Sequence, residues 1–207
     1  MKRKVDIDSW VRKAHFEFFN TFEEPYYGVC VNIDCSAAYR FAKRGGVSVF
    51  LYCLYQSLSA AQRIEPFKHR IEQGEVFLHE QIDAGSTIAR SNGTFGYGHI
   101  LYRENLEDFL EGANREVERV RGANDLTRTT ASNIIRYSAL PWIDFTALSH
   151  ARMFSVPDSC PRISFGKMTE TAGRRSMPVS IHVHHALVDG LHVGQYIDCF
   201  QELMNEQ

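Results

Sequence analysis

The chain has 207 residues, a formal net charge of -2 and an isoelectric point of ≈ 6.5. Its residues are 44% hydrophobic and 23% charged, which is typical of a globular domain with an ordinary core. We therefore expect a single domain, residues 1–207. The nearly balanced charge argues against nucleic acid as a main partner.

The sequence carries no targeting or membrane signal that we recognise. The charged segment 1–8 is not followed by the apolar region of a signal peptide, and the most apolar stretch, 47–61, is too short to span a bilayer. The five cysteines are odd in number and include no CxxC pair, so we expect free thiols. These features predict a cytoplasmic protein without membrane contact.

In the N-terminal half, Asp8 and Ser9 precede apolar residues that recur at helical spacing from Trp10 to Phe22, which predicts a capped helix. A strand is expected at 27–33. The apolar segment 49–64 predicts a buried helix that ends before Pro66. Three short strands should follow, at 69–71, 76–79 and 86–89.

In the C-terminal half, the glycine-rich segment 91–99 predicts a loop, and 105–121 an amphipathic helix. Further strands are expected at 134–138, 162–167 and 177–184, and a last helix at 191–204. Strands and helices mix without regular alternation. The fold class is therefore α/β, a sandwich of a mixed sheet packed with helices.

The most informative segment is the end of the last predicted strand, PVSIHVHHALVDG at 178–190. His185 follows where that strand ends, and Asp189 with Gly190 predicts a turn before the final helix. A neutral imidazole can accept a proton at working pH, so His185 is a candidate general base. Asp189 would fix the loop or orient the ring.

These histidines allow two other interpretations. His182, His184 and His185 could form a metal site, but neighbouring strand residues point in opposite directions, so the last two would not easily share one ion. No carboxylate stands at helical ligand spacing either, and we expect no metal. Packed histidines without chemistry are the second alternative, which the complete HHxxxDG pattern makes weaker.

The segment HHALVDG at 184–190 resembles the signature of the CoA-dependent acyltransferases, which include chloramphenicol acetyltransferases and dihydrolipoyl acyltransferase catalytic domains. Three more segments are similar to the chloramphenicol acetyltransferases in particular. They are WVRKAHFEFF at 10–19, SALPW at 138–142 followed by Phe145, and DGLHVGQYIDCFQEL at 189–203. Their order and separations match that family over essentially the whole chain.

This resemblance implies a CoA-dependent acyltransferase-like two-layer sandwich that transfers acetyl from acetyl-CoA to a hydroxyl of chloramphenicol or a similar small molecule. It implies an antibiotic-resistance enzyme, and a homotrimer whose active sites lie between subunits. His185 would be the general base. Ser138 aligns with a serine that donates to the oxyanion, and Ser164 with a threonine that holds a water.

The resemblance also assigns supporting roles. Arg12 aligns with an arginine that pairs with Asp189, although a solvated helix arginine is the alternative. Trp142 and Lys167 align with positions along the CoA channel, where an aromatic face and an ammonium suit that cofactor. A core tryptophan and a surface lysine are the alternatives there.

The predicted acceptor pocket departs from the family. Aromatic residues are retained at Phe18, Phe19 and Phe95, but polar, charged or bulkier residues occupy other positions: Tyr97, Arg136, His150, Arg152, Asp158 and Arg162. Burial of a polar group without a hydrogen bond costs about 2–7 kcal/mol, and burial of an unpaired charge costs more. Such residues are therefore tolerated in a pocket only if they pair with one another or contact a polar ligand. Either Arg152 pairs with Asp158 and seals the pocket, or the acceptor is more polar than chloramphenicol, even anionic. An idle, ligand-binding trimer is a further alternative.

Overall fold

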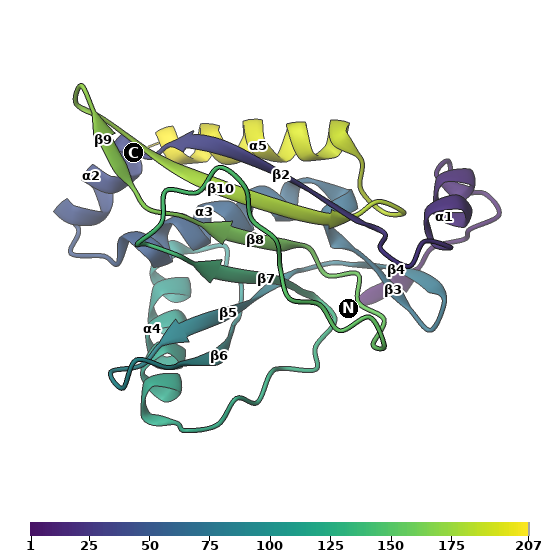
Figure 1. The fold of residues 1–207 in the computed structure, drawn as a ribbon, viewed down its shortest axis with the longest axis horizontal. Coiled ribbons are helices and arrows are strands. Elements are labelled where there is room, and N and C mark those ends of the chain that lie inside the picture. The colour runs from purple at the N-terminus through teal and green to yellow at the C-terminus, as the bar shows by residue number, and fades with distance from the viewer. Residues whose placement is uncertain (207) are drawn as a thin grey trace.

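The computed structural model describes residues 1–206, and its main element is a mixed β-sheet (Figure 1). The strand order is β2-β10-β8-β7-β5-β6, and β7 runs parallel to both of its neighbours while the other pairs are antiparallel. The bounds are β2 Tyr26–Asp34, β5 Asp83–Ala89, β6 Phe95–Ile100, β7 Ile134–Ala139, β8 Arg162–Phe165 and β10 Arg174–His184. A short strand, β9 (Thr169–Thr171), pairs with the start of β10.

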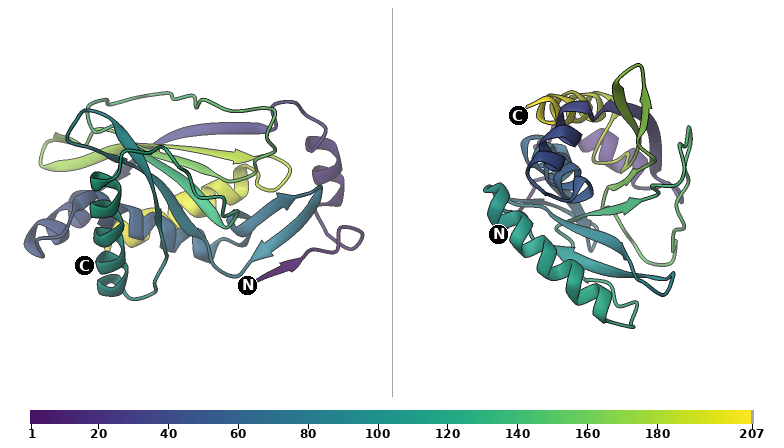
Figure 2. Two further views of the ribbon diagram at one scale, coloured as in Figure 1. Left: turned by 90° about the horizontal axis from the view of Figure 1, so that it is seen from below. Right: turned by 90° about the vertical axis from the view of Figure 1, so that its left-hand side faces the viewer.

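Four helices lie on one side of this sheet (Figure 2), namely α2 (Ser36–Arg44), α3 (Val49–Arg63), α4 (Leu106–Gly122) and α5 (Gly190–Asn205). Most of α3 is buried because it packs against α2, α4 and α5 as well as the core. The sheet residues that face the helices are apolar and buried, including Ile135, Ile163 and Ile181. The α/β sandwich with a mixed sheet is therefore confirmed.

A three-stranded antiparallel sheet forms one end of the molecule (Figure 1), where the chain also begins. It consists of β1 (Lys2–Lys4), β4 (Glu75–His79) and β3 (His69–Glu72), with the 3-10 helix η1 (Glu65–Lys68) before β3 and helix α1 (Lys13–Phe19) nearby. Arg70 is buried at the junction with the main sheet and donates hydrogen bonds to four backbone carbonyls, including those of Ser132 and Ile134. These carbonyls compensate the desolvated guanidinium and join the two sheets.

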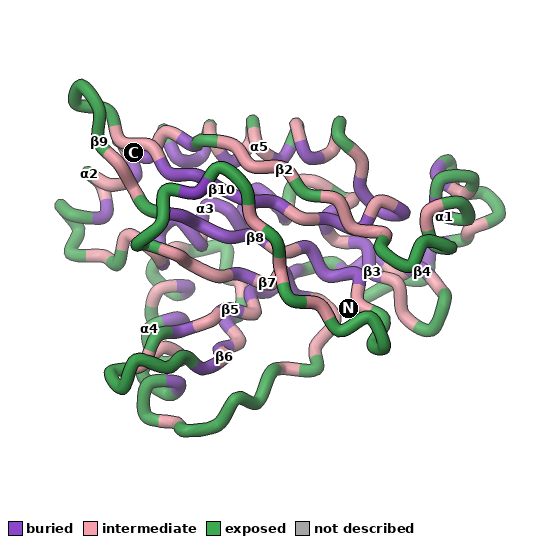
Figure 3. The backbone as a smooth tube through the Cα atoms, in the orientation of Figure 1, coloured by how far each residue is buried: buried purple, intermediate pink, exposed green. Residues whose placement is uncertain are grey.

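On the opposite face of the main sheet, the described residues 1–206 form no helix. Instead the long connection 140–161, between β7 and β8, crosses in front of it (Figure 1). His150 of this connection packs on His182 of β10 with ring centroids 4.8 Å apart, and Arg162 donates to the Ala151 carbonyl at 3.0 Å. In Figure 3 most of this connection is green, because most of its residues are exposed. His150 and Ala151 of the connection line a cavity together with residues of β5, β6, β7 and β8.

Two local predictions were wrong. The segment 91–99 is not a loop throughout, because β6 begins at Phe95; Gly96 and Gly98 are strand glycines that let α4 and Arg90 approach. A Cβ at Gly96 would meet Val120 of α4 at 2.7 Å. The first helix is also shorter than predicted, and Ser9 does not cap it because its hydroxyl binds Asp6 at 2.8 Å.

The remaining elements fall within a few residues of their predicted bounds. The five cysteines are free thiols. Within residues 1–206, the structure has no helix of the length and apolar character that a membrane span requires.

Candidate active site

His185 lies just beyond β10, against helix α1. Its ring stacks on Phe19 with centroids 3.9 Å apart and an interplanar angle of 6°, and Tyr27 packs beside it at 4.6 Å. Its backbone N–H donates to the Pro25 carbonyl at 2.8 Å. Nδ1 is buried without a hydrogen-bond partner among residues 1–206. The other ring nitrogen, Nε2, is therefore the one left open to a ligand.

Phe18 and Phe22 extend this surface away from the histidine. Phe18, Phe19 and Phe22 pack on one another with ring centroids 5.0–5.2 Å apart. Phe18, on α1, is 61% exposed, and Phe22, three residues after the end of α1, is 44% exposed. Neighbouring exposed phenylalanines are unusual on the surface of a soluble domain. Phe18, Phe19 and Phe22 thus form a partly exposed apolar surface beside His185.

Arg12 and Asp189 form the predicted ion pair, with Arg12 Nη1 2.6 Å from Asp189 Oδ2. Arg12 also donates to the His185 carbonyl at 3.4 Å, so the pair fixes the backbone of the candidate base. Asp189 caps α5 by accepting from the Leu191 and His192 backbone N–H groups. Burial raises the pKa of Asp189, but the bond from Arg12 and nearby positive charge outweigh it and lower the pKa.

We expect Asp189→Ala to lower the free energy of unfolding by about 3 kcal/mol, because it removes both an ion pair and a helix cap. The Asp189 side chain is 31% exposed and that of Arg12 11%, which places the cost at the lower end for a buried pair. Urea unfolding measures the loss. Asp198→Ala, on an exposed position of the same helix, is the control and should change stability by less than about 0.5 kcal/mol. Equal effects of the two changes would contradict the assigned role of the pair.

A second group of predicted residues lies on the helix-free face of the sheet. Ser138, Ser164 and Ser180 are in register on β7, β8 and β10, so they form a row across the sheet. The hydroxyls of Ser138 and Ser164 are 2.7 Å apart. Ser164 is fully buried, whereas Ser138 is partly exposed and lines a cavity. Ser138 is thus the hydroxyl of the row that a ligand reaches.

Within one chain, His185 and Ser138 do not meet. Ser180 precedes His185 by five residues, about 16 Å of extended strand, and Ser138 lies two strands further across the sheet. The structure therefore separates the predicted catalytic residues into a His185 group beside α1 and a Ser138 group in front of β7. A site that uses both is therefore not formed within one chain.

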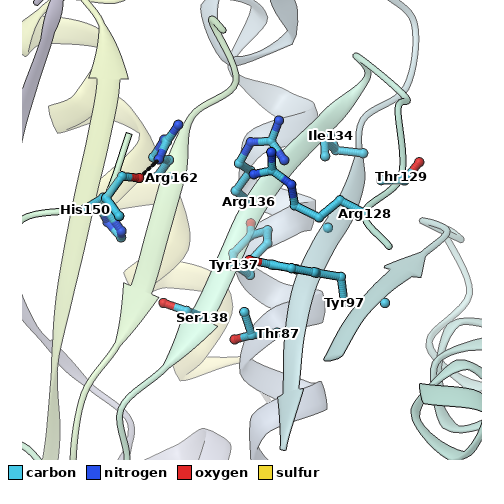
Figure 4. Close-up of a pocket in the computed structure, with 13 residues that line it drawn as sticks. Thr87, Tyr97, Arg128, Thr129, Ile134, Arg136, Tyr137, Ser138, His150 and Arg162 are labelled. Atoms are coloured by element: carbon cyan, nitrogen blue, oxygen red, sulfur yellow. Dashed lines mark hydrogen bonds between the residues drawn. The ribbon is translucent and has the colours of Figure 1, made fainter. Parts of the chain in front are cut away.

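The cavity in front of Ser138 has a volume of ≈ 210 Å³ (Figure 4). Of the residues predicted for the acceptor pocket, Tyr97, Arg136, His150 and Arg162 line it. Phe95 packs edge-on against Tyr97 with ring centroids 5.6 Å apart. Burial lowers the pKa of His150 to about 4, so this ring is neutral at pH 7. Arginine and hydroxyl side chains line the cavity together with tyrosines and Ile134, whereas a site for a flat neutral ring is typically lined mostly by apolar side chains.

The alternative in which Arg152 pairs with Asp158 and seals the pocket is not observed. Asp158 instead accepts from Arg162 at 2.7 Å and from Arg136 at 3.3 Å, because these arginines are paired in register on neighbouring strands. Burial raises the pKa of Asp158, but the charges of Arg136 and Arg162 outweigh burial, and the net result is a lowered pKa. Arg152 pairs with Glu24 and stacks 3.9 Å over the Tyr26 ring, outside this cavity.

The three neighbouring histidines diverge. His182 contacts His150, His184 packs against Tyr26, and His185 stacks on Phe19. In the described part of the chain, 1–206, no three side chains of ligand type come together as a metal site would require. The structure thus offers no preformed metal centre among these residues.

The two residues predicted to bind CoA lie close together beyond the end of β7. The backbone N–H of Lys167 donates to the Ile143 carbonyl at 2.8 Å, which places Lys167 beside Trp142. Trp142 is 76% exposed, so it is not a core tryptophan. An exposed indole face next to an exposed ammonium suits a ring and a phosphate.

Sequence reasoning missed several residues around these groups. Thr87 and Arg128 line the Ser138 cavity, and Tyr27 packs on the His185 ring. The alternation of β5 would have placed Thr87 on the same face as Gly85, but Arg128 lies in an irregular segment without any local signal.

The fold and these residues define an acyltransferase of the CoA-dependent superfamily, and comparison with known proteins specifies the family. Residues 2–201 match the family described as "Chloramphenicol acetyltransferase". The chain is 25% identical to chloramphenicol acetyltransferase 3 of Escherichia coli, covering 99% of this chain and 97% of that one, and 27% identical to chloramphenicol acetyltransferase of Bacillus pumilus, covering 99% and 94%.

Solved structures agree. A chloramphenicol acetyltransferase superposes with a TM-score of 0.91 at 29% identity, covering 99% of this chain and 100% of that one. A dihydrolipoamide acetyltransferase of Azotobacter vinelandii, 16% identical, shares the fold with a TM-score of 0.67, covering 93% and 86%. The chain belongs to the chloramphenicol acetyltransferase family and is an acyltransferase of that family.

Proposed function

We propose that the protein transfers the acetyl group of acetyl-CoA to a hydroxyl of a small molecule, in sites formed between the subunits of a homotrimer in the cytoplasm. The observation that carries the proposal is the placement of an open imidazole and an accessible serine hydroxyl on separate surfaces of one chain. Each surface is incomplete by itself, and rotational symmetry would bring the His185 surface of one subunit to the Ser138 surface of its neighbour.

Exposed apolar side chains support this assembly. Phe18 and Phe22 are exposed beside His185, and Trp142, Ile143 and Phe95 are exposed around the Ser138 surface. Large apolar side chains that gather near two incomplete sites are typical of surfaces that become covered on association. Their positions favour a contact that joins these two surfaces.

In this proposal acetyl-CoA supplies the acetyl group as a thioester. Nε2 of His185 removes the proton of the acceptor hydroxyl as its oxygen attacks the thioester carbon. Ser138 donates its O–H to the oxygen on which negative charge develops, while Ser164, 2.7 Å away, holds the Ser138 hydroxyl in place. When the carbon–sulfur bond breaks, the imidazolium returns the proton to the sulfur.

Chloramphenicol is the first acceptor to test, because the relatives described above are named chloramphenicol acetyltransferases. The polar cavity favours the second candidate, a more polar hydroxyl compound. The test measures thiol release from acetyl-CoA with a panel of hydroxyl acceptors. Release that depends on an acceptor and on His185 would support the proposal, and its absence with every acceptor would count against it. Turnover of polar acceptors alone would exclude chloramphenicol as a substrate.

A further inference from the structure

The cavity in front of Ser138 carries more positive than negative charge. Three arginines line it, namely Arg128, Arg136 and Arg162 (Figure 4). Asp158 forms ion pairs with two of them, Arg136 and Arg162. One oxygen of Asp158 accepts from Arg136 and Arg162, and the other from the Cys160 backbone N–H at 3.0 Å. One carboxylate thus balances one of three guanidinium charges.

The excess charge is available to a ligand. Among residues 1–206, no carboxylate forms an ion pair with Arg128, whose guanidinium carbon lies 5.7 Å from the centre of the Tyr97 ring. In Figure 4 the Arg128 side chain extends over the cavity in the direction of Arg136. Arg136 uses only Nε in hydrogen bonds to described residues, which leaves its two terminal nitrogens free for a ligand. Their donors fit the geometry of a carboxylate or a phosphate.

The donors of Arg136 lie at a fixed distance from Ser138, the proposed oxyanion donor, because both residues belong to β7. Arg136 and Ser138 are two residues apart on β7, so their side chains face the same cavity from Cα atoms about 7 Å apart. The neutral groups between and around them can also hydrogen bond: Thr87 and Thr129 have hydroxyls, and His150 has a buried Nε2 without a partner among the described residues. A small molecule whose hydroxyl lies at Ser138 would present its other end to Arg136 and Arg128.

We propose that the acceptor is a small hydroxyl compound with an anionic group, a carboxylate or a phosphate, that binds Arg136 and Arg128. This rests on the acetyl transfer proposed above and specifies its substrate class. A neutral apolar acceptor would cover the free donors of Arg128 and Arg136 without a hydrogen bond, whereas an anion satisfies them with charge-assisted hydrogen bonds. The volume of ≈ 210 Å³ limits the part of the acceptor inside the cavity to a small group.

Matched probes test the inference by calorimetry on the intact protein. The probes are 4-(2-hydroxyethyl)benzoate, 4-(2-hydroxyethyl)phenyl phosphate and the neutral 4-(2-hydroxyethyl)benzamide. We expect an anionic probe to bind at least about 10-fold more tightly than the benzamide. Arg128→Gln and Arg136→Gln should each weaken that probe about 10-fold and leave the benzamide unchanged. Arg115→Gln, an exposed arginine on α4 paired with Glu111, is the control with the same loss of charge.

The comparison of the two anionic probes identifies which anion the cavity takes. Equal affinities for all three probes, or a preference for anions that survives both arginine substitutions, would overturn the inference. A loss of CoA affinity in both variants would also overturn it, because the arginines would then serve the phosphates of CoA. Thiol release from acetyl-CoA with the same probes tests the acetyl transfer separately, since calorimetric binding needs no reaction. Arg128 is exposed, so its variant remains informative if Arg136→Gln fails to fold.

Discussion

We expect His185→Ala to lower kcat for acetyl transfer at least about 10⁴-fold, because proton removal and its positioning are lost together. The ring is held for this task by the parallel face of Phe19 and by backbone contacts to Pro25 and Arg12. The small alanine side chain leaves those backbone contacts in place. The variant should therefore fold and bind CoA like the parent protein, and only turnover should fall.

His184→Gln is the matched control for that measurement. His184 is the neighbouring imidazole, but it lies on the other face of β10 against Tyr26, and burial lowers its pKa to about 4. Its removal should change kcat by less than about 10-fold, provided that the fold is retained. A larger loss in His184→Gln than in His185→Ala would show that the wrong histidine has been assigned as the base.

Ser138→Ala should lower kcat about 10²-fold without abolishing CoA binding, which corresponds to about 3 kcal/mol of lost transition-state stabilisation. The Ser138 hydroxyl is positioned by Ser164 at 2.7 Å and opens into the cavity, as an oxyanion donor must. The effect is smaller than that of His185→Ala because the reaction loses one donor while the base remains.

Ser180→Ala is the matched control for the serine. Ser180 belongs to the same row across the sheet, but its hydroxyl is buried and has no partner within residues 1–206. Removing it should leave kcat within about 3-fold of the parent value. Steady-state kinetics measures kcat for Ser138→Ala and Ser180→Ala. Similar losses in both would show that the row supports the sheet rather than the chemistry.

The strands and helices of the core could be predicted from the sequence because their buried apolar residues recur at the spacing of a strand or a helix. Ile134 to Ser138 and the segment ending at His184 alternate between the helix-covered face and the open face, and both form strands. Strand β6 escaped prediction because its glycines suggest a loop, whereas in the fold they make room for α4. That requirement comes from a helix packed against the strand, which no local pattern records.

The candidate site was predictable in its parts but not in its arrangement. The motif at 184–190 singled out His185 and Asp189, and the pairing of Asp189 with Arg12 is present as predicted. The partners of Asp158 were not predictable, because the register of β7 against β8 brings Arg136 and Arg162 to one carboxylate. Sequence proximity made Arg152 one possible partner, but Arg152 pairs with Glu24.

Mixing two inactive variants tests most directly whether His185 and Ser138 act on one acceptor across a subunit boundary. His185→Ala and Ser138→Ala proteins are unfolded together in equal amounts, refolded, and assayed by thiol release from acetyl-CoA. If each site takes its histidine from one subunit and its serine from the next, random assembly should restore about a quarter of the parent activity. A mixture that stays as inactive as the separate variants, although it reassembles, would contradict the shared site.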